Sequence, residues 1–351
     1  MPRERIRIGV AGLGRIGWEF HCRQIATHPE FELAAVQDVK PERRREAEQT
    51  YGAQTFRDFT VMLDTAHLDV AVVATPTHYH KPMSIEALRK GCHVFLEKPM
   101  AANAADAGAI VRAAKRYSRI VTVYQPLRAS AYFQHLRKIL ASGIIGDVYH
   151  IRVGGYRYAR RNDWQAMRRF GGGMLNNYGA HSLDQLLQLI GYDVKRVFAN
   201  LRVAASLGDA DDVVKVIIET RSGVIGELDV NQASTINPYV LQVWGTRGAL
   251  TMGENRDRFV ITYFKSSDLP TKSLNTALAS VGRKYPTDDI AFREETVPVD
   301  QSLAVDVYAD LATAIRRSRA PFVKAEEPLA VMRLIDRCRE SSGRVIKMKR
   351  P

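Results

Sequence analysis

The chain has little cysteine and no long apolar run. Only three of its 351 residues are cysteine (Cys22, Cys92 and Cys338), and no two of them form a CxxC pair. An odd and widely spaced set argues against a disulfide framework and fits reduced thiols. No segment approaches a membrane span, and strand-like sequence begins at Ile6 without an apolar leader ahead of it. We therefore expect a cytoplasmic protein with no membrane association.

Acidic residues are also scarce. The chain has 38 Asp and Glu against 51 Lys and Arg, which gives a formal net charge of +13. Its basic clusters, at Arg43–Arg45 and between Arg152 and Arg169, lie on no DNA-reading motif and are not interleaved with aromatics as in RNA-binding modules. We expect no nucleic-acid partner. Arg43–Arg45 is interpreted as a solvated helix face, and the second cluster as a region near a substrate.

Residues 1–124 alternate apolar runs with helical patterns, which predicts βαβ units and an N-terminal doubly wound parallel sheet of the Rossmann type. The expected strands are Ile6–Ala11, Leu33–Gln37, Val70–Ala74, Val94–Leu96 and Ile120–Tyr124. The expected helices are Glu42–Tyr51, Lys81–Lys90 and Asn103–Ser118.

Residues 125–351 differ in character, because short turns join successive strand-like segments. This pattern predicts a second, α+β domain with an open, mainly antiparallel sheet. The expected strands are Tyr149–Tyr156, Val194–Ala205, Val213–Thr220, Val224–Asn231, Val240–Gly245, Phe259–Phe264 and Val345–Met348. The expected helices are 133–142, His181–Ile190, Leu303–Ser318 and Pro328–Ser342. Residues 266–298 show no clear period and are expected to form a long surface excursion.

A glycine-rich motif follows the first expected strand and opens a helix. In Gly12-Leu13-Gly14-Arg15-Ile16-Gly17, the three glycines have the spacing of the dinucleotide-binding fingerprint, and Asp38 ends the second strand. The glycines allow a tight turn and a close approach of the pyrophosphate to the helix N-terminus, while Asp38 would accept hydrogen bonds from the ribose. The motif predicts NAD as the cofactor. Lys40 and Arg43 lie close to Asp38 in the sequence, so NADP remains the alternative cofactor.

Two later strands also end at the crevice where such a sheet binds its ligand. Thr75-Pro76 ends one of them, and Glu97-Lys98-Pro99 ends the other. Lys98 therefore lies near the nicotinamide, on a stem stiffened by the following proline. His78 and His80 form an HxH without a third ligand, so we expect no metal. The further predicted cofactor contacts are Arg15, Ile16, Thr75, Pro76, His78, Glu97 and Lys98.

Together these motifs resemble the Gfo/Idh/MocA oxidoreductases, a family that includes inositol dehydrogenase and glucose–fructose oxidoreductase. The resemblance covers nearly the whole chain. Besides the motifs above, it includes residues 74–80, 142–146, 171–184 and 244–248. It implies a second domain whose open sheet commonly forms dimers or tetramers. We therefore expect a homodimer or homotetramer assembled through the C-terminal sheet.

The resemblance also implies catalytic groups. In the family, the lysine of E-K-P and an Asp-x-x-x-His pair handle the proton, which assigns Lys98 and His181 here. Asn177 replaces the usual aspartate. The i, i+4 spacing would place Asn177 and His181 on one helix face, where an amide can orient the ring but offers no negative charge. Lys98 would then carry more of the acid–base work, with its pKa lowered by burial.

The predicted function is hydride transfer between NAD(P) and a hydroxyl or carbonyl carbon of a sugar, cyclic polyol or sugar acid. Two alternatives remain open: a cofactor-binding regulatory or scaffold protein without turnover, and a non-redox glycoside-cleaving enzyme that recycles its NAD. The arginines near the glycine run favour an anionic small-molecule substrate, and the alternative is that they hold the loop or line a subunit interface. The candidate substrate-binding residues are Arg128, Arg157, Trp164, Tyr178 and His181.

Overall fold

The computed structural model describes residues 4–276, 283 and 288–348. Its N-terminal part is a parallel six-stranded sheet in the order β3-β2-β1-β4-β5-β6. The strands are β1 (Ile6–Ala11), β2 (Phe31–Gln37), β3 (Gln54–Phe56), β4 (Val70–Val73), β5 (His93–Leu96) and β6 (Val121–Val123). β1 and β4 lie side by side at the centre, where the strand order reverses. Ligands of such sheets bind in this crevice.

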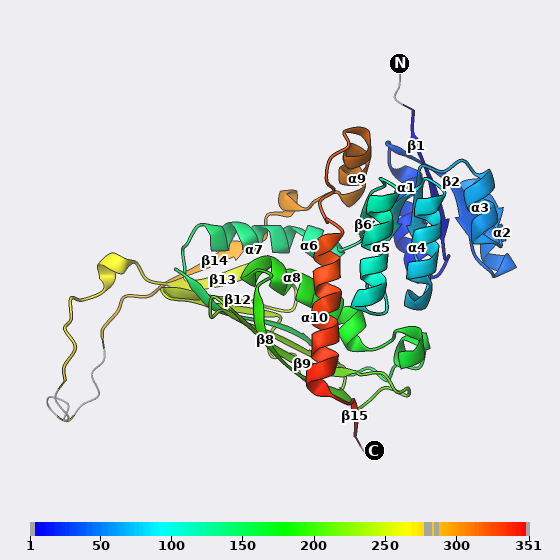
Figure 1. Ribbon diagram of the computed structural model, residues 1–351. Helices are drawn as coiled ribbons and strands as arrows, with labels where there is room; N and C mark the ends of the chain where they lie inside the picture. Colours follow the sequence, from blue (N-terminus) through cyan, green and yellow to red (C-terminus); the bar gives the residue numbers. More distant parts are fainter. Residues whose placement is uncertain (1–3, 277–282, 284–287, 349–351) are drawn as a thin grey trace.

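Helices connect these parallel strands (Figure 1). A π-helical turn at Gly17–Cys22 leads into α1 (Arg23–Thr27), and α2 (Pro41–Tyr51), α3 (Phe59–Thr65), α4 (His80–Arg89) and α5 (Ala104–Arg116) follow. α5 begins because the side chain of Asn103 accepts a hydrogen bond from the amide of Asp106 at 2.8 Å. Its apolar face is buried against the sheet. The predicted Rossmann fold is confirmed.

The second sheet has nine strands in the order β14-β13-β12-β11-β7-β10-β9-β8-β15. It is mixed, because β7–β10 and β8–β15 pair in parallel while the other neighbours are antiparallel. The strands are β7 (Val148–Tyr156), β8 (Val194–Val203), β9 (Val213–Thr220), β10 (Ile225–Asn231), β11 (Leu241–Gly245), β12 (Gly248–Met252), β13 (Arg258–Tyr263), β14 (Arg293–Pro298) and β15 (Ile346–Lys347).

Helices from the C-terminal half cover one face of this sheet and reach back to the first one (Figure 1). They are α6 (Pro126–Ala129), α7 (Ala131–Ala141), α8 (Ala180–Ile190), α9 (Val307–Arg316) and α10 (Glu326–Ser342). α10 packs against α5, α8 and β8, so it joins the two sheets. Tyr308 and Leu311 of α9 lie in the same buried cluster as Ile8 and Val10 of β1. A helix late in the sequence therefore completes the N-terminal core.

Several elements were not expected from the sequence. They include the helices α3 and α6 and the strands β3, β12 and β14. β3 and β14 are the outermost strands of their sheets, and the side chains of β14 are mostly exposed. An edge strand with an exposed surface carries polar side chains, so it lacks the apolar run that marks a central strand. Only the last six residues of the expected excursion at 266–298 form strand β14, and residues 277–282 and 284–287 lie outside the described residues.

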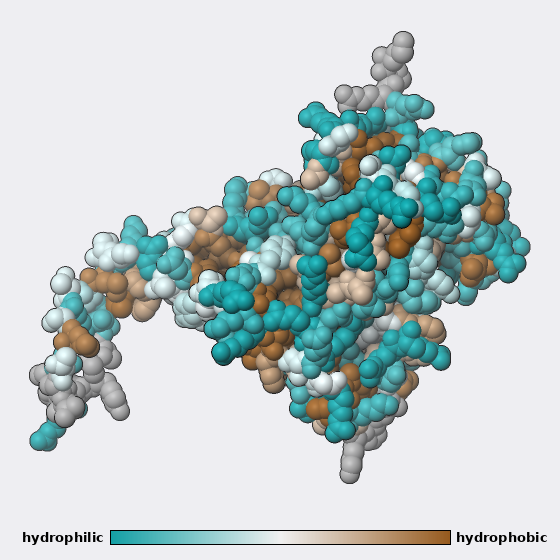
Figure 2. All heavy atoms as spheres, viewed as in Figure 1, coloured by the Kyte–Doolittle hydropathy of each residue, from teal (hydrophilic) through white to brown (hydrophobic). Residues whose placement is uncertain are grey.

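Between β13 and β14, residues 264–276 and 288–292 extend away from the body of the molecule (Figure 1). Figure 2 shows hydrophilic residues over most of the face in view, with apolar residues along this extension. Its exposed apolar side chains include Leu269, Leu274 and Phe292. Among the described residues, no helix combines the length and the apolar character needed to cross a membrane.

Candidate active site

The glycine-rich turn links β1 to the first helix through contacts that leave no room for side chains. Gly12 has φ +91°, and a Cβ on Gly17 would lie 1.8 Å from the carbonyl oxygen of Gly12. Only glycine meets both conditions without strain. Gly14 differs, because a Cβ there would meet no atom within 4 Å. Its outer side is open, next to the first amides of a helix that begins at Arg15.

Asp38 lies at the end of β2 and is tied to this turn. Its Oδ2 accepts from the amide of Leu13 at 2.8 Å and from Nη1 of Arg43 at 3.1 Å, and its Oδ1 accepts from the amide of Lys40 at 2.9 Å. Nη1 of Arg44 donates to the main-chain oxygen of Asp38 at 2.7 Å. Arg43 and Arg44 are therefore not simply solvated, as the charge run suggested, because both hydrogen-bond to Asp38 at the end of β2.

These residues fit a bound NAD(P). The open side of Gly14 and the first helix amides would bind the pyrophosphate, and Asp38 would bind the adenosine ribose. The aliphatic and main-chain atoms of Thr75 and Pro76 border the same crevice at the end of β4.

Gly14→Ala tests this cradle. We expect NADH to bind roughly tenfold more weakly, because the added methyl group occupies the space of the phosphates. The thermal midpoint of the free protein should stay unchanged, since nothing lies within 4 Å of the added atom. Fluorescence titration with NADH measures the affinity. Gly17→Ala serves as the contrast, because its methyl group would overlap Gly12 and should lower the thermal midpoint instead. Unchanged affinity in Gly14→Ala would contradict the cradle.

Lys98 reaches from the end of β5 to the first turn of the helix that carries His181. Its Nζ donates to Oδ1 of Asn177 at 2.7 Å and lies 3.3 Å from the main-chain oxygen of the same residue. Nδ2 of Asn177 in turn donates to Oε1 of Gln165 at 3.0 Å. The structure thus brings together two of the predicted catalytic residues, and a neutral amide holds the amine.

The environment of Lys98 favours its neutral amine. Burial lowers the pKa of Lys98, the charge of Glu97 acts in the opposite direction, and the charges of Arg161 and Arg15 lower it further. A carboxylate at position 177 would favour the ammonium form, whereas Asn177 adds no such charge. Lys98 is therefore suited to accept a proton.

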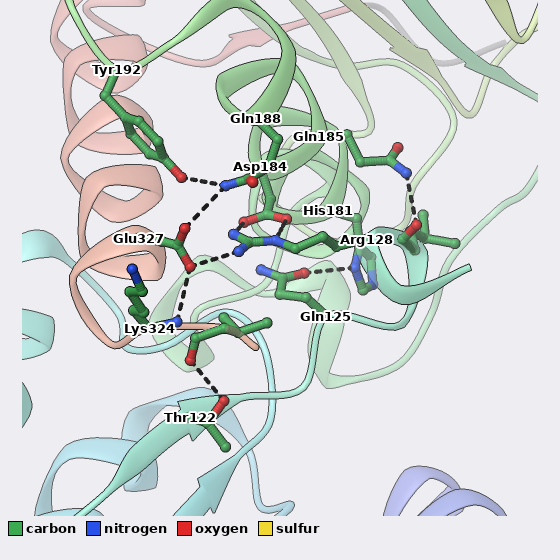
Figure 3. A network of polar contacts seen from close by, with 12 residues as sticks. Thr122, Gln125, Arg128, His181, Asp184, Gln185, Gln188, Tyr192, Lys324 and Glu327 are labelled. Carbon is green, nitrogen blue, oxygen red and sulfur yellow. Dashed lines mark hydrogen bonds and ion pairs between the residues drawn. The ribbon is translucent and has the colours of Figure 1, made fainter. Parts of the chain in front are cut away.

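His181 lies on α8 and is held by a residue that the sequence did not indicate. Its Nδ1 lies 3.1 Å from Oε1 of the buried Gln125 (Figure 3). The amide oxygen accepts, so the ring donates from Nδ1 and keeps the lone pair of Nε2 free. Burial lowers the pKa of His181 well below its usual range, and the charges of Lys98 and Arg256 act in the same direction. The ring is neutral.

The expected contact between Asn177 and His181 is absent from the hydrogen bonds of the described residues. The helix starts with a π-helical turn at Leu175–Gly179. A π-helix has more residues in each turn than an α-helix, so residues four apart no longer lie directly above one another. Asn177 therefore turns towards Lys98 and Gln165 rather than towards His181.

Arg128 does not face the cleft. Its side chain is 2% exposed, its Nε donates to Oδ2 of Asp184 at 2.8 Å, and its Nη1 donates to Oε2 of Glu327 at 2.7 Å (Figure 3). Burial alone would lower the pKa of the Arg128 guanidinium, but its bonds with Asp184 and Glu327 outweigh burial and raise it. Arg128 ties α6 to α8 and α10. Asp184 is equally occupied and supports no chemistry at His181.

The other substrate candidates lie around Tyr178, one residue after Asn177. The guanidinium of Arg157 lies 5.4 Å from the centre of the Tyr178 ring, and its Nε donates to Gln232 at 2.8 Å. Trp164 is partly buried in a short 3-10 helix, Trp164–Ala166, next to Gln165. Arg161 forms two bonds with Asp163, at 2.8 and 2.9 Å. Of these residues, Arg157 is the one with a contact to Tyr178 among the described interactions.

The two histidines of the HxH contact different parts of the molecule. The exposed His78 packs against Phe170 with ring centres 5.5 Å apart, so it connects the two domains. The buried His80 has its two ring nitrogens 2.8 and 2.9 Å from the main-chain oxygens of Thr75 and Pro99. It connects the loops after β4 and β5. Among the described residues, no group of three or more His, Cys, Asp or Glu could hold a metal.

The match to known proteins covers both domains. The Gfo/Idh/MocA oxidoreductase family, with an NAD-binding Rossmann fold, matches residues 6–125, and the family's C-terminal domain matches residues 133–251. The chain belongs to this family. It is therefore an NAD(P)-dependent oxidoreductase, and the predicted family and cofactor class are confirmed.

The relatives include sugar-alcohol dehydrogenases. The chain is 27% identical to myo-inositol 2-dehydrogenase of Thermotoga maritima, over 77% of this chain and 81% of the relative. It is 23% identical to scyllo-inositol 2-dehydrogenase (NADP(+)) of Bacillus subtilis, over 97% and 94%. An NAD-binding protein from Listeria innocua has a similar structure, with a TM-score of 0.83, 26% identity and coverage of 97% and 95%.

Proposed function

We propose that the protein oxidises a secondary hydroxyl of a cyclic polyol, sugar or sugar acid, or reduces the matching ketone. One observation carries the proposal: the amine of Lys98, bound to a neutral amide, lies in the same site as a neutral His181 whose Nε2 is free. Alcohol oxidation needs such a base at the hydroxyl. The inositol dehydrogenases among the relatives support the substrate class.

Each residue of the site has a separate role in the proposed reaction. Nε2 of His181 accepts a hydrogen bond from a neighbouring hydroxyl of the substrate and so orients the substrate, while the single proton of the reacting hydroxyl faces Nζ of Lys98. Lys98 takes the hydroxyl proton as the carbonyl forms, and its resulting ammonium then donates a hydrogen bond to the carbonyl oxygen. Bound NAD(P) supplies the hydride acceptor. Asn177 and Gln165 hold Nζ of Lys98 in place throughout, since amides neither gain nor lose protons at neutral pH.

The arginines support a preference for an anionic substrate. Arg15 and Arg161 lie close enough to Lys98 for their charges to lower its pKa, and Arg157 lies beside Tyr178. A carboxylate on the substrate would be attracted by this positive potential.

A substrate screen tests the proposed function. Purified protein is mixed with NAD or NADP and with a panel of inositols, aldoses and uronates, and reduced cofactor is followed by absorbance while products are analysed by mass spectrometry. We expect net NAD(P)H formation, fastest with a uronate. Product without net NAD(P)H would indicate the glycoside-cleaving alternative, and cofactor binding without product would indicate the regulatory alternative.

Asn177→Asp should change the pH dependence in a defined direction. A carboxylate in bonding distance of Nζ favours the ammonium and raises the pKa of Lys98. Oxidation requires the neutral amine, so its acid limb should move to higher pH and the rate at neutral pH should fall by about tenfold. Ketone reduction, which uses the ammonium, should persist to higher pH. The pH profiles of both directions provide the measurement, and identical profiles for the two proteins would contradict the role given to Asn177.

A further inference from the structure

Three buried polar side chains form a hydrogen-bonded chain that ends at Glu97, the residue before the catalytic lysine. Nδ1 of His21 lies 2.6 Å from the hydroxyl of Tyr308, and its Nε2 lies 2.9 Å from Oε1 of Glu97. The other carboxylate oxygen, Oε2, accepts from the main-chain amide of Lys98 at 3.1 Å. Tyr308, His21 and Glu97 are 2%, 0% and 6% exposed. The chain therefore joins α9 and the first helix to the end of β5.

The protons in this chain have one consistent arrangement. Burial raises the pKa of Tyr308 well above its usual range, and nearby Tyr124 and Glu97 act in the same direction, so its hydroxyl keeps its proton and donates. Nδ1 of His21 then accepts, which leaves the ring proton on Nε2. Nε2 donates to Oε1 of Glu97. The carboxylate thus receives a donor on each oxygen, one from His21 and one from Lys98.

Packing alone does not explain why these three buried side chains are polar. Around His21 lie the aromatic rings of Phe95 and Tyr124, with centres 5.6 and 5.1 Å from its own, and Phe95 also packs against Tyr308. A phenylalanine at position 308 would fill the same volume. Burying a hydroxyl, an imidazole and a carboxylate costs free energy unless each is hydrogen-bonded. The arrangement is explained if the orientation of Glu97 matters to its neighbour Lys98.

We propose that His21 and Tyr308 are positioning residues for the active site, which fix the carboxylate of Glu97 beneath Lys98 and so set the position and the basicity of its amine. The inference rests on the proposed function of Lys98. Among the described residues, Glu97 is the one negative charge that influences the proton affinity of Lys98, and it opposes burial, Arg161 and Arg15. Loss of the Tyr308 hydroxyl releases His21 to either tautomer, and the carboxylate loses its fixed donor.

The charged and titratable groups that face this chain are few. Glu97 follows β5, Tyr124 follows β6, Cys22 neighbours His21, and Asp306 precedes α9. The ring of His28 also packs on Tyr308, with ring centres 6.1 Å apart. Burial raises the pKa of the Cys22 thiol to about 12, so Cys22 stays neutral. Asp306 is exposed and lies 3.5 Å from Nε2 of His28. Glu97 is therefore the charge through which the chain acts on Lys98.

Tyr308→Phe is the test, because it removes one oxygen and keeps the ring. Nitrogen-15 NMR of histidine-labelled protein reports the tautomer of His21. The lysine side-chain signal that is present in the wild type but missing from Lys98→Met belongs to Lys98, and its titration can then be followed. Both measurements need no substrate. We expect wild-type His21 to carry its proton on Nε2 and Tyr308→Phe to lose that preference. Lys98 should then titrate at lower pH, because the supporting charge of Glu97 is no longer held in place.

The kinetic result should match. With a substrate from the screen, Tyr308→Phe should move the acid limb of oxidation to lower pH and reduce the plateau kcat by about tenfold, since small misplacements of a catalytic group cost such factors. KM for NAD should stay unchanged. Glu97→Gln, which removes the charge at constant size, should move the titration of Lys98 further in the same direction and provides the second variant if Tyr308→Phe folds poorly.

Tyr132→Phe is the matched control. Its hydroxyl accepts from Nε2 of Gln185 at 2.6 Å but lies outside the chain below Lys98. We expect this variant to leave the titration of Lys98 unchanged. A lower thermal midpoint in Tyr308→Phe with an unaltered Lys98 titration would overturn the proposal and leave a purely structural role. If Lys98 titrates as expected while Lys98→Met retains turnover, the proposed function fails and the positioning of Lys98 stands.

Discussion

Lys98→Met is expected to lower kcat by about a hundredfold to ten-thousandfold, the range for loss of a general base. Methionine has a similar length but carries no group that accepts the hydroxyl proton. His181 does not replace it, because its lowered pKa makes it a poor proton acceptor. Binding of NADH should be retained, since the cradle at Gly14 and Asp38 lies apart from Nζ of Lys98. Steady-state kinetics and NADH titration on the same preparation separate the two effects.

Lys90→Met provides the control for this result. Lys90 pairs with Asp64 on the surface, at the far end of α4 from the active site. Lys90→Met removes one positive charge, as Lys98→Met does, and also one surface ion pair. It leaves the cleft intact. Exposed ion pairs contribute about 1 kcal/mol or less. We expect wild-type kcat from Lys90→Met, and near-normal turnover of Lys98→Met would refute the assignment of the proton acceptor.

Arg128→Met is expected to reduce the free energy of unfolding by about 3–5 kcal/mol, because it leaves a buried charge without its partner. Asp184 is 1% exposed and accepts both of its strong bonds from Arg128. Burial already raises the pKa of Asp184, and the bonds from Arg128 are what oppose this effect. Urea denaturation followed by tryptophan fluorescence measures the loss.

A second substitution distinguishes the lost charge from the lost volume. In the double variant Arg128→Met with Asp184→Leu, the buried carboxylate that pairs with Arg128 is gone, while Glu327 is partly exposed and can be hydrated. Replacing a buried ion pair by apolar side chains is often neutral. The double variant should therefore regain most of the stability. Equal instability of the single and double variants would show that packing, and not the uncompensated charge, explains the loss.

The same ion-pair network connects stability to the active site. Gln125 directly precedes α6, which carries Arg128, and His181 lies one turn before Asp184 on α8. The pairing of Arg128 with Asp184 therefore fixes the two helices at the separation that lets Gln125 hold the His181 ring (Figure 3). We expect Arg128→Met to lower activity as well as stability, although Arg128 touches no reacting atom.

Local motifs made the cofactor side of the site predictable. The fingerprint from Gly12 to Gly17, Asp38 and Lys98 all follow strands of one parallel sheet, so their common position follows from sheet topology. Two of the strands that the sequence did not indicate, β3 and β14, are edges whose polar side chains carry no core pattern. The same reason does not apply to β12, which lies inside the second sheet, or to α3, which buries Phe59, Met62 and Leu63.

The second half of the site depends on contacts between distant segments. A lone glutamine carries no chemical signal, so nothing in the sequence assigned Gln125 to His181 or Gln165 to Asn177. The partners of Arg128 lie on α8 and α10, and a sequence pattern does not pair a charge with a distant helix. The spacing of Asn177 and His181 was read as α-helical, whereas the chain has a π-helical turn there. Each difference arises from tertiary packing.

The most direct test of the central claim is the pH dependence of single-turnover hydride transfer in the wild type and in Lys98→Met. The proton acceptor must be neutral, so the wild-type rate of NAD reduction should fall at low pH along a single-proton limb. The residual rate of Lys98→Met should lack that limb and stay flat over the same range. The same acid limb in both proteins would show that another group takes the proton and would contradict the role of Lys98.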